Sequence, residues 1–135
     1  MNDRPDAREL LEAVRRFLAD EAVPALGGHL GYQARVAANV VGIVAREIEF
    51  GPGDLEREWR GLAALLETSG EPPREAGALH VQIREGNEAL CERIRAGEAD
   101  VGPWRESLVA HLQAVTEQKL AVARGIPGEP RPGRD

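Results

Sequence analysis

Apolar residues recur at helical spacing along most of this chain, and no stretch shows the strict alternation that is typical of a strand. The run over residues 32–49 is the most apolar part. Two sets of small and branched residues repeat there at intervals of three or four: Val36, Val40 and Ile43, and Ala37, Val41, Val44 and Ile48. Because a helix that is apolar on most of its surface is usually buried, we expect this one near the centre of the fold.

Turn and capping signals divide the pattern into five predicted helices. Asp6 and Glu9 have the spacing of a capping box, Gly51-Pro52-Gly53 is expected to end the second helix, and Pro103 suits the first position of the last one. The predicted helices span 6–22, 29–50, 54–68, 74–96 and 103–124. Short connections between amphipathic helices predict an all-α fold, an antiparallel up-and-down bundle of five helices with a central apolar second helix.

Each predicted helix offers one apolar stripe to a shared core. In the first helix the stripe consists of Leu10, Leu11, Val14, Phe17 and Leu18, and in the last helix of Trp104, Leu108, Leu112, Val115 and Leu120. We expect one helical-bundle domain over 1–124. The segment 125–135 is rich in proline, glycine and charge, which predicts a flexible tail.

Composition narrows the class of protein. The content of 42% hydrophobic and 30% charged residues is typical of a soluble globular protein. The net charge of -6 argues against nucleic acid as a partner, and no apolar run approaches the ~20 residues of a membrane span. A single cysteine, Cys91, and the lack of a secretory signal favour the cytoplasm.

Several chemistries have no support in the sequence. The three histidines, His29, His80 and His111, are scattered, and none has a second ligand at the spacing of a zinc site. Neither a nucleophile elbow nor a phosphate-binding loop is present. We therefore expect no metal, no cofactor and no catalytic residues, and no enzymatic activity of the chain on its own.

A row of polar and charged residues lies on the otherwise apolar second predicted helix and has two possible explanations. Arg35, Asn39 and Arg46 share one side of it, and Glu47 falls on a side that is expected to face inward. Buried side chains of this kind need partners. One interpretation is a structural polar network, with Glu47 paired to an arginine, that fixes the register of the bundle.

The other interpretation is a binding site for a ligand or a protein partner at the beginning of this helix. The positive helix end near His29, the phenol of Tyr32 and the guanidinium of Arg35 would hold an anionic or acyl ligand. Asn39 and Arg46 would extend the same surface. Both interpretations remain open at this point.

A stripe of small residues on the second helix allows another helix to approach closely. It consists of Ala34, Ala38, Val41 and Ala45. The approaching helix could come from this chain or from a second copy of it, so a homodimer is one expected form of partnership.

Several segments resemble a small uncharacterised bacterial domain, catalogued as a domain of unknown function. They are residues 4–14, the turn Pro24-Ala25-Leu26-x-Gly28, and Arg35-Val36-Ala37-Ala38-Asn39 followed by Arg46-Glu47. The resemblance implies a companion of aminoglycoside-phosphotransferase-like kinases or of acyl-CoA dehydrogenases, and related chains carry the label acyl-CoA dehydrogenase-related. The present chain is too short for the flavoenzyme fold itself.

Together these observations predict a non-catalytic accessory or interaction module. By resemblance, it would act beside a small-molecule kinase or an acyl-CoA-oxidising enzyme, which would be its protein partner. The alternative is a small-molecule-binding protein that holds a phosphate-bearing or acyl-CoA-like ligand near the beginning of the second helix.

Overall fold

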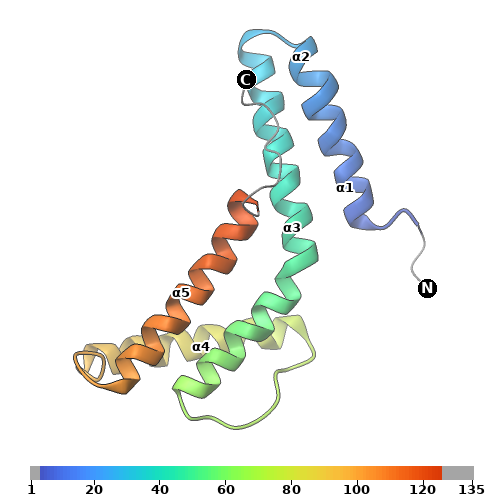
Figure 1. Ribbon diagram of the computed structural model, residues 1–135. Helices are drawn as coiled ribbons and strands as arrows, with labels where there is room; N and C mark the ends of the chain where they lie inside the picture. Colours follow the sequence, from blue (N-terminus) through green and yellow to red (C-terminus); the bar gives the residue numbers. More distant parts are fainter. Residues whose placement is uncertain (1–3, 126–135) are drawn as a thin grey trace. The chain divides into compact units, whose positions relative to one another are not determined.

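The computed structural model describes residues 4–125, and these residues are mostly helical, with no strand among them. The elements are α1 (Ala7–Arg16), the π-helical segment η1 (Phe17–Ala22), α2 (Val23–Ala25), α3 (Gly28–Leu65), α4 (Ala76–Arg95) and α5 (Pro103–Arg124). Figure 1 shows them in chain order. The prediction of an all-α fold is confirmed for this part of the chain.

The prediction of five separate helices is wrong for the described residues. The segments α1, η1 and α2 follow one another without a break, and the second and third predicted helices are one helix, α3, so that four helical stretches remain. Pro52 lies inside α3 instead of ending it. A proline removes one backbone hydrogen bond, but Leu62 and Leu65 beyond it are buried, and this packing keeps the chain helical.

The chain divides into two compact units at the Gly51-Pro52-Gly53 sequence. The first comprises Met1–Phe50 and Leu120–Asp135, of which 4–50 and 120–125 are described, and the second comprises Gly51–Lys119. We call them the hairpin unit and the three-helix unit. The predicted flexible tail lies outside the described residues except for Gly125. The single domain over 1–124 stays a prediction.

In the hairpin unit, α1 lies antiparallel to the first half of α3 (Figure 1). The predicted capping box at its beginning is confirmed: Asp6 accepts a hydrogen bond from the Glu9 amide, and Glu9 accepts one from the Asp6 amide. On the part of α3 that belongs to this unit, residues 28–50, the buried positions are all small, namely Gly31, Ala34, Ala38 and Gly42. Two residues of the predicted small-residue stripe, Ala34 and Ala38, are thus buried, whereas Val41 and Ala45 are only partly buried. The contact of Gly42 with the Arg15 side chain shows that α1 approaches α3 closely here.

The larger apolar residues of the hairpin unit are mostly on its outside. The prediction that Leu10, Val14 and Phe17 are buried is wrong, since each of them exposes about half of its surface. The second predicted helix is not central either, because Val36 and Val40 are exposed as well. The reason is that a two-helix layer has only one interior seam, and small residues occupy it.

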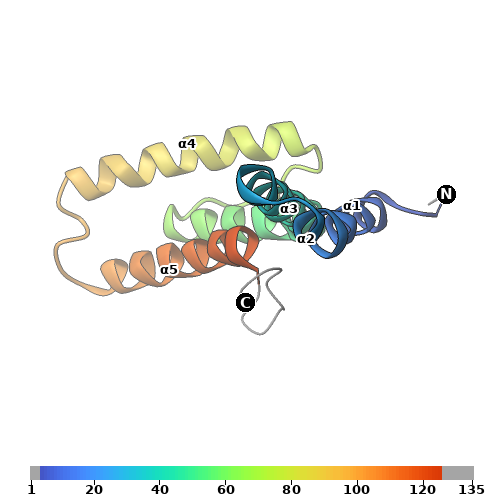
Figure 2. The same ribbon diagram turned by 90° about the horizontal axis from the view of Figure 1, so that it is seen from above.

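The three-helix unit has a core of larger residues. The second half of α3 lies between α4 and α5 (Figure 2). The core consists of Leu62, Leu65, Leu79, Ile83, Leu90 and Leu108. Two side chains from different helices, Arg93 and Trp104, donate to the backbone carbonyl of Leu65 at 2.8 and 3.0 Å, which ties the end of α3 to α4 and α5.

Candidate functional site

The predicted site residues at the beginning of α3 lie on its surface. His29, Tyr32, Arg35 and Asn39 are exposed, and 63% of the Tyr32 surface is accessible to solvent. Side chains this exposed do not need internal partners. Their role in binding a ligand or a protein stays a prediction.

The two charged residues further along this helix differ from each other. Arg46 is partly buried, and its Nε donates to the backbone carbonyl of Val122 near the end of α5, 2.7 Å away. Glu47 is exposed, so the expectation of a buried carboxylate at this position is wrong. Helical spacing predicts that Glu47 shares a side with neighbouring valines that were expected to be buried. In the structure those valines face solvent too.

A pocket of about 640 Å³ lies in the three-helix unit, between the second half of α3 and α5. Its size is within the range of small-molecule sites. The polar part of its lining includes Arg57, Glu58, Ser107, His111 and Gln118. The apolar part includes Ala64, Leu65, Trp104, Ala114 and Val115.

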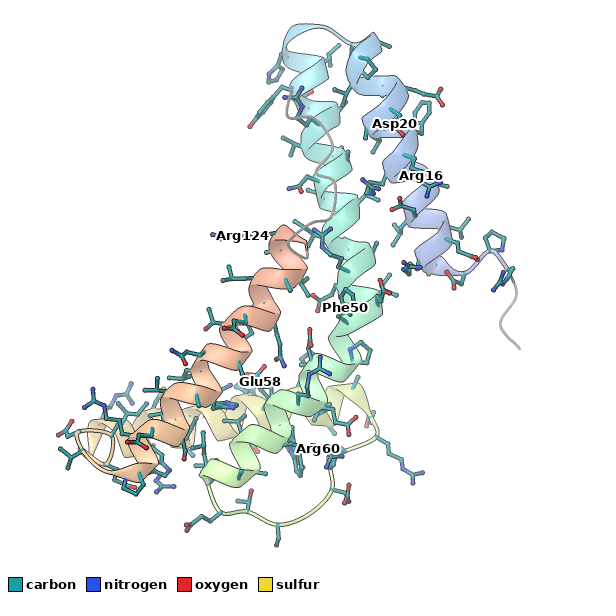
Figure 3. All side chains as sticks on the ribbon, in the orientation of Figure 1. Arg16, Asp20, Phe50, Glu58, Arg60 and Arg124 are labelled. Atoms are coloured by element: carbon teal, nitrogen blue, oxygen red, sulfur yellow. The ribbon has the colours of Figure 1, made fainter. Side chains whose placement is uncertain are left out.

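Glu58 gives this pocket a buried carboxylate, since only 7% of the residue is accessible. Its Oε1 accepts a hydrogen bond from Asn87 Nδ2 of α4 at 3.2 Å, and its Oε2 lies 3.9 Å from Lys119 Nζ of α5. Figure 3 shows Glu58 on α3 where this helix passes α5. Because the Lys119 side chain is 70% exposed and the ion pair is long, it compensates little of the cost of burying the charge.

His111 faces Glu58 across the pocket and packs against the backbone of α3 at Gly61. A Cβ at Gly61 would overlap His111 Nδ1 and would lie 2.7 Å from Cε1, so only glycine admits the ring in this position. Burial lowers the pKa of His111, and the negative charge of Glu58 opposes this shift. At neutral pH the ring is therefore mainly neutral and offers one donor and one acceptor nitrogen.

Trp104 forms the end of the pocket and is held from two sides. Its indole N–H donates to the Leu65 carbonyl, and the Arg93 guanidinium lies over its ring at 4.3 Å from the centroid. A cation above the ring and a hydrogen bond in its plane restrain the indole. The aromatic wall is therefore fixed in place before any ligand enters.

The sequence contains a signal for this site, although neither Glu58 nor His111 is among the predicted site residues. Leu55, Glu58, Leu62 and Leu65 follow the 3-4-3 spacing of a core seam, which places a carboxylate among leucines. Trp104, Leu108, His111 and Val115 follow the 4-3-4 spacing, which does the same for the imidazole. A polar residue at a seam position is a better indicator of a site than one on an exposed line.

Two other kinds of feature are absent from residues 4–125. No helix there has both the length and the apolar character needed to cross a lipid bilayer. No group of three or more histidine, cysteine, aspartate or glutamate side chains gathers there in a way that could hold a metal ion. Cys91 is exposed on α4.

The described chain is thus an all-helical protein with a hairpin unit and a pocket-bearing three-helix unit. A family model described as "Domain of unknown function (DUF6285)" matches residues 24–124, and the chain belongs to this family. The resemblance to an uncharacterised domain is confirmed at this level. No curated protein and no solved structure matches the chain.

Proposed function

We propose that this protein is a non-catalytic accessory module whose three-helix unit binds a small organic cation. The observation that carries the proposal is the buried carboxylate of Glu58 in the wall of a pocket. Its partners are a neutral amide and a distant, solvent-exposed ammonium group. A buried charge with so little compensation favours a ligand of opposite charge.

The remaining lining suits a ligand that carries an apolar body beside its cationic group. Leu65, Trp104 and Val115 supply apolar surface, and His111 supplies an acceptor nitrogen when it is neutral. The formal charge of the lining is negative, since Glu58 and Glu67 outnumber Arg57. Arg57 is itself paired with Asp54. An anionic ligand would meet repulsion from Glu58.

The experiment is a binding titration with a defined probe. Phenethylammonium is the cationic probe, 2-phenylethanol the neutral control and 3-phenylpropionate the anionic one. Trp104 fluorescence in a Trp59→Phe background reports on the pocket, because the chain has two tryptophans and only Trp104 lines it. We expect saturable binding of the ammonium compound, at least tenfold tighter than that of the other two.

Glu58→Gln is the decisive variant, because it removes the charge and keeps the shape. It should weaken phenethylammonium binding at least tenfold, whereas Glu56→Gln, on the exposed side of the same helix, should not change it. Equal binding of the alcohol, or an unchanged affinity in Glu58→Gln, would contradict the proposed function.

The resemblance adds a proposed setting for this activity. The module would act beside a small-molecule kinase or an acyl-CoA-oxidising enzyme and present or sense a ligand for it. Isothermal titration with a purified aminoglycoside-phosphotransferase-like kinase and with a purified acyl-CoA dehydrogenase tests this setting. If an enzyme binds and the affinity for phenethylammonium is unchanged, the partner site is separate from the pocket. If neither enzyme class gives a heat of binding, the proposed setting is refuted, but the proposed ligand binding is not.

A further inference from the structure

The hairpin unit carries an apolar surface on both of its helices. We call it the apolar hairpin face. Its side chains expose between 43% and 55% of their surface each. They are Leu10 and Val14 of α1, Phe17 at the beginning of η1, and Val40, Val44 and Ile48 of α3.

Contacts between the two helices define which residues of each helix lie at the same height. Three contacts define an antiparallel register in which the residue numbers of facing positions add up to a constant. They are Arg8 with Glu49, Arg15 with Gly42 and Leu26 with Gly31. To within one residue, the same register sets Leu10 level with Ile48, Val14 level with Val44, and Phe17 level with Val40.

Helix geometry places both rows on the same side of the hairpin. At about 100° per residue, each row is turned by roughly a quarter to a third of a revolution from the interior seam of its own helix, in the same rotational sense. Because the helices are antiparallel, an equal turn in the same sense leads to the same side. The apolar hairpin face is therefore one surface and not two.

The charged and polar residues of this hairpin lie mainly on the opposite side. By the same geometry, Glu12 and Arg16 of α1 and Arg35, Asn39 and Arg46 of α3 are turned the other way. Glu12 is bonded to both Arg15 and Arg16. The apolar hairpin face has no charged residue among its six side chains, although the whole chain carries a net charge of -6.

The area of this face matches what one partner contributes to a stable dimer. From the exposed fractions, its six side chains leave on the order of 500 Å² of apolar surface in water, as much as the largest patches on monomeric proteins. A standard interface buries about 800 Å² per partner, and in homodimers roughly two thirds of it is apolar. The exposed apolar area of the apolar hairpin face therefore agrees with the apolar area that one partner buries in a standard homodimer interface.

We propose that a second copy of this chain covers the apolar hairpin face, so that two hairpins form an antiparallel four-helix bundle. A two-helix layer with one apolar side is half of such a bundle. A two-fold axis brings the face onto itself, which requires a surface that does not repel its own copy. This face meets that requirement because it is uncharged, whereas an interface formed by the acidic remainder of the chain would not.

Sedimentation equilibrium of the full-length protein tests the proposal. A mass of twice the 14.6 kDa chain is expected at micromolar concentration. The double variant Val40→Glu/Val44→Glu should raise the dissociation constant at least a hundredfold and leave the helical circular dichroism unchanged. Val81→Glu is the matched control, because Val81 is 42% exposed on α4 and belongs to the other unit; it should remain dimeric.

Val40→Thr/Val44→Thr provides a second test that does not depend on tolerating two charges. Threonine keeps the shape of valine and adds a hydroxyl group, so this variant should fold normally and dimerise at least tenfold more weakly. A monomeric wild-type chain at 100 µM overturns the proposal, as does a dimer that neither double variant weakens. Since the pocket lies in the three-helix unit, either result leaves the proposed ligand binding untouched.

Discussion

Replacing Gly61 with alanine tests the contact on which the candidate site depends. In the interior of a helix, alanine in place of glycine normally stabilises by about 1 kcal/mol. At this position the new methyl group would lie 2.7 Å from His111 Cε1 and would overlap Nδ1, so the imidazole has to move. Forcing one extra carbon into a packed place costs about 1–3 kcal/mol. We expect a net loss of about 1 kcal/mol in the free energy of unfolding.

The effect of Gly61→Ala on the free energy of unfolding should change sign when the His111 imidazole is removed. In a His111→Ala background the methyl group meets no ring, and Gly61→Ala should then stabilise by about 1 kcal/mol. The coupling energy of this double-mutant cycle is thus about 2 kcal/mol. Gly53→Ala is the control on the same helix, where the nearest atoms belong to the flexible Arg57 side chain at 3.5 Å or beyond, and it should behave alike in both backgrounds.

Urea denaturation followed by tryptophan fluorescence measures this cycle, because Trp59 and Trp104 both lie in the three-helix unit. The same samples should be titrated with phenethylammonium, since a displaced imidazole would alter the pocket. If Gly61→Ala stabilised the protein equally with and without His111, the ring would not rest on this glycine. The geometry described for the site would then be wrong.

Three further predictions concern stability. Leu90→Ala should lower the free energy of unfolding by about 2–5 kcal/mol, since the leucine is 2% exposed in the core, and a loss below about 1 kcal/mol in urea melts would contradict that placement. Burial lowers the pKa of His111, so the unfolded chain binds a proton on this imidazole more readily than the folded chain does. The contribution of His111 to stability is therefore full above about pH 6.5 and falls as the pH drops further. In thermal melts, a His111→Gln variant should lose less stability than the wild type between pH 7.5 and 5.5. Hydrogen bonding to Arg15 is the main cause that holds the pKa of Glu12 at about 2. The resulting contribution to the free energy of unfolding is present above about pH 4.5 and is lost toward pH 2. Because the pair is partly exposed, Glu12→Gln should cost less than about 1 kcal/mol by chemical denaturation at pH 7.

The sequence predicted local structure well where a local signal was sufficient. The capping box at Asp6 and the helix beginning at Pro103 are both present, because each depends on a few neighbouring residues. The helix end that the sequence predicts at Pro52 is absent from the structure, where α3 continues through this residue. A proline is a local signal against a helix, but the burial of leucines further along the chain is a tertiary effect that outweighs it.

Burial was harder to predict, because a helical wheel shows which residues share a side and not which side is covered. The wheel of α3 has small residues on one side and valines on another. The hydrophobicity of the valines predicts that they are in the core, whereas α1 packs against the side that carries Ala34 and Ala38. Glu47 was placed inside for the same reason. Nothing in the α3 sequence alone specifies which neighbour it meets.

The candidate site escaped prediction for a related reason. His111 was considered as one of three scattered histidines, and Glu58 was not considered, because residues so far apart in sequence come together only when α3 and α5 pack side by side. Their seam positions could have indicated them, since each places a polar group among the apolar residues of a helix seam.

The two units therefore divide the physical tasks of this chain between them. The three-helix unit has a core of leucine and isoleucine that can hold a buried charge, and it does so beside a pocket. In the hairpin unit the fully buried positions are glycine and alanine, which contribute little hydrophobic stabilisation, and many of its larger apolar groups are exposed to water. Covering those groups would stabilise the hairpin far more than its own seam does. Dimerisation and hairpin stability should then be coupled, so that the melting temperature of the hairpin unit rises with protein concentration while that of the three-helix unit does not. Hydrogen exchange of α1 amides at two protein concentrations measures this directly, and protection that does not depend on concentration would refute the coupling.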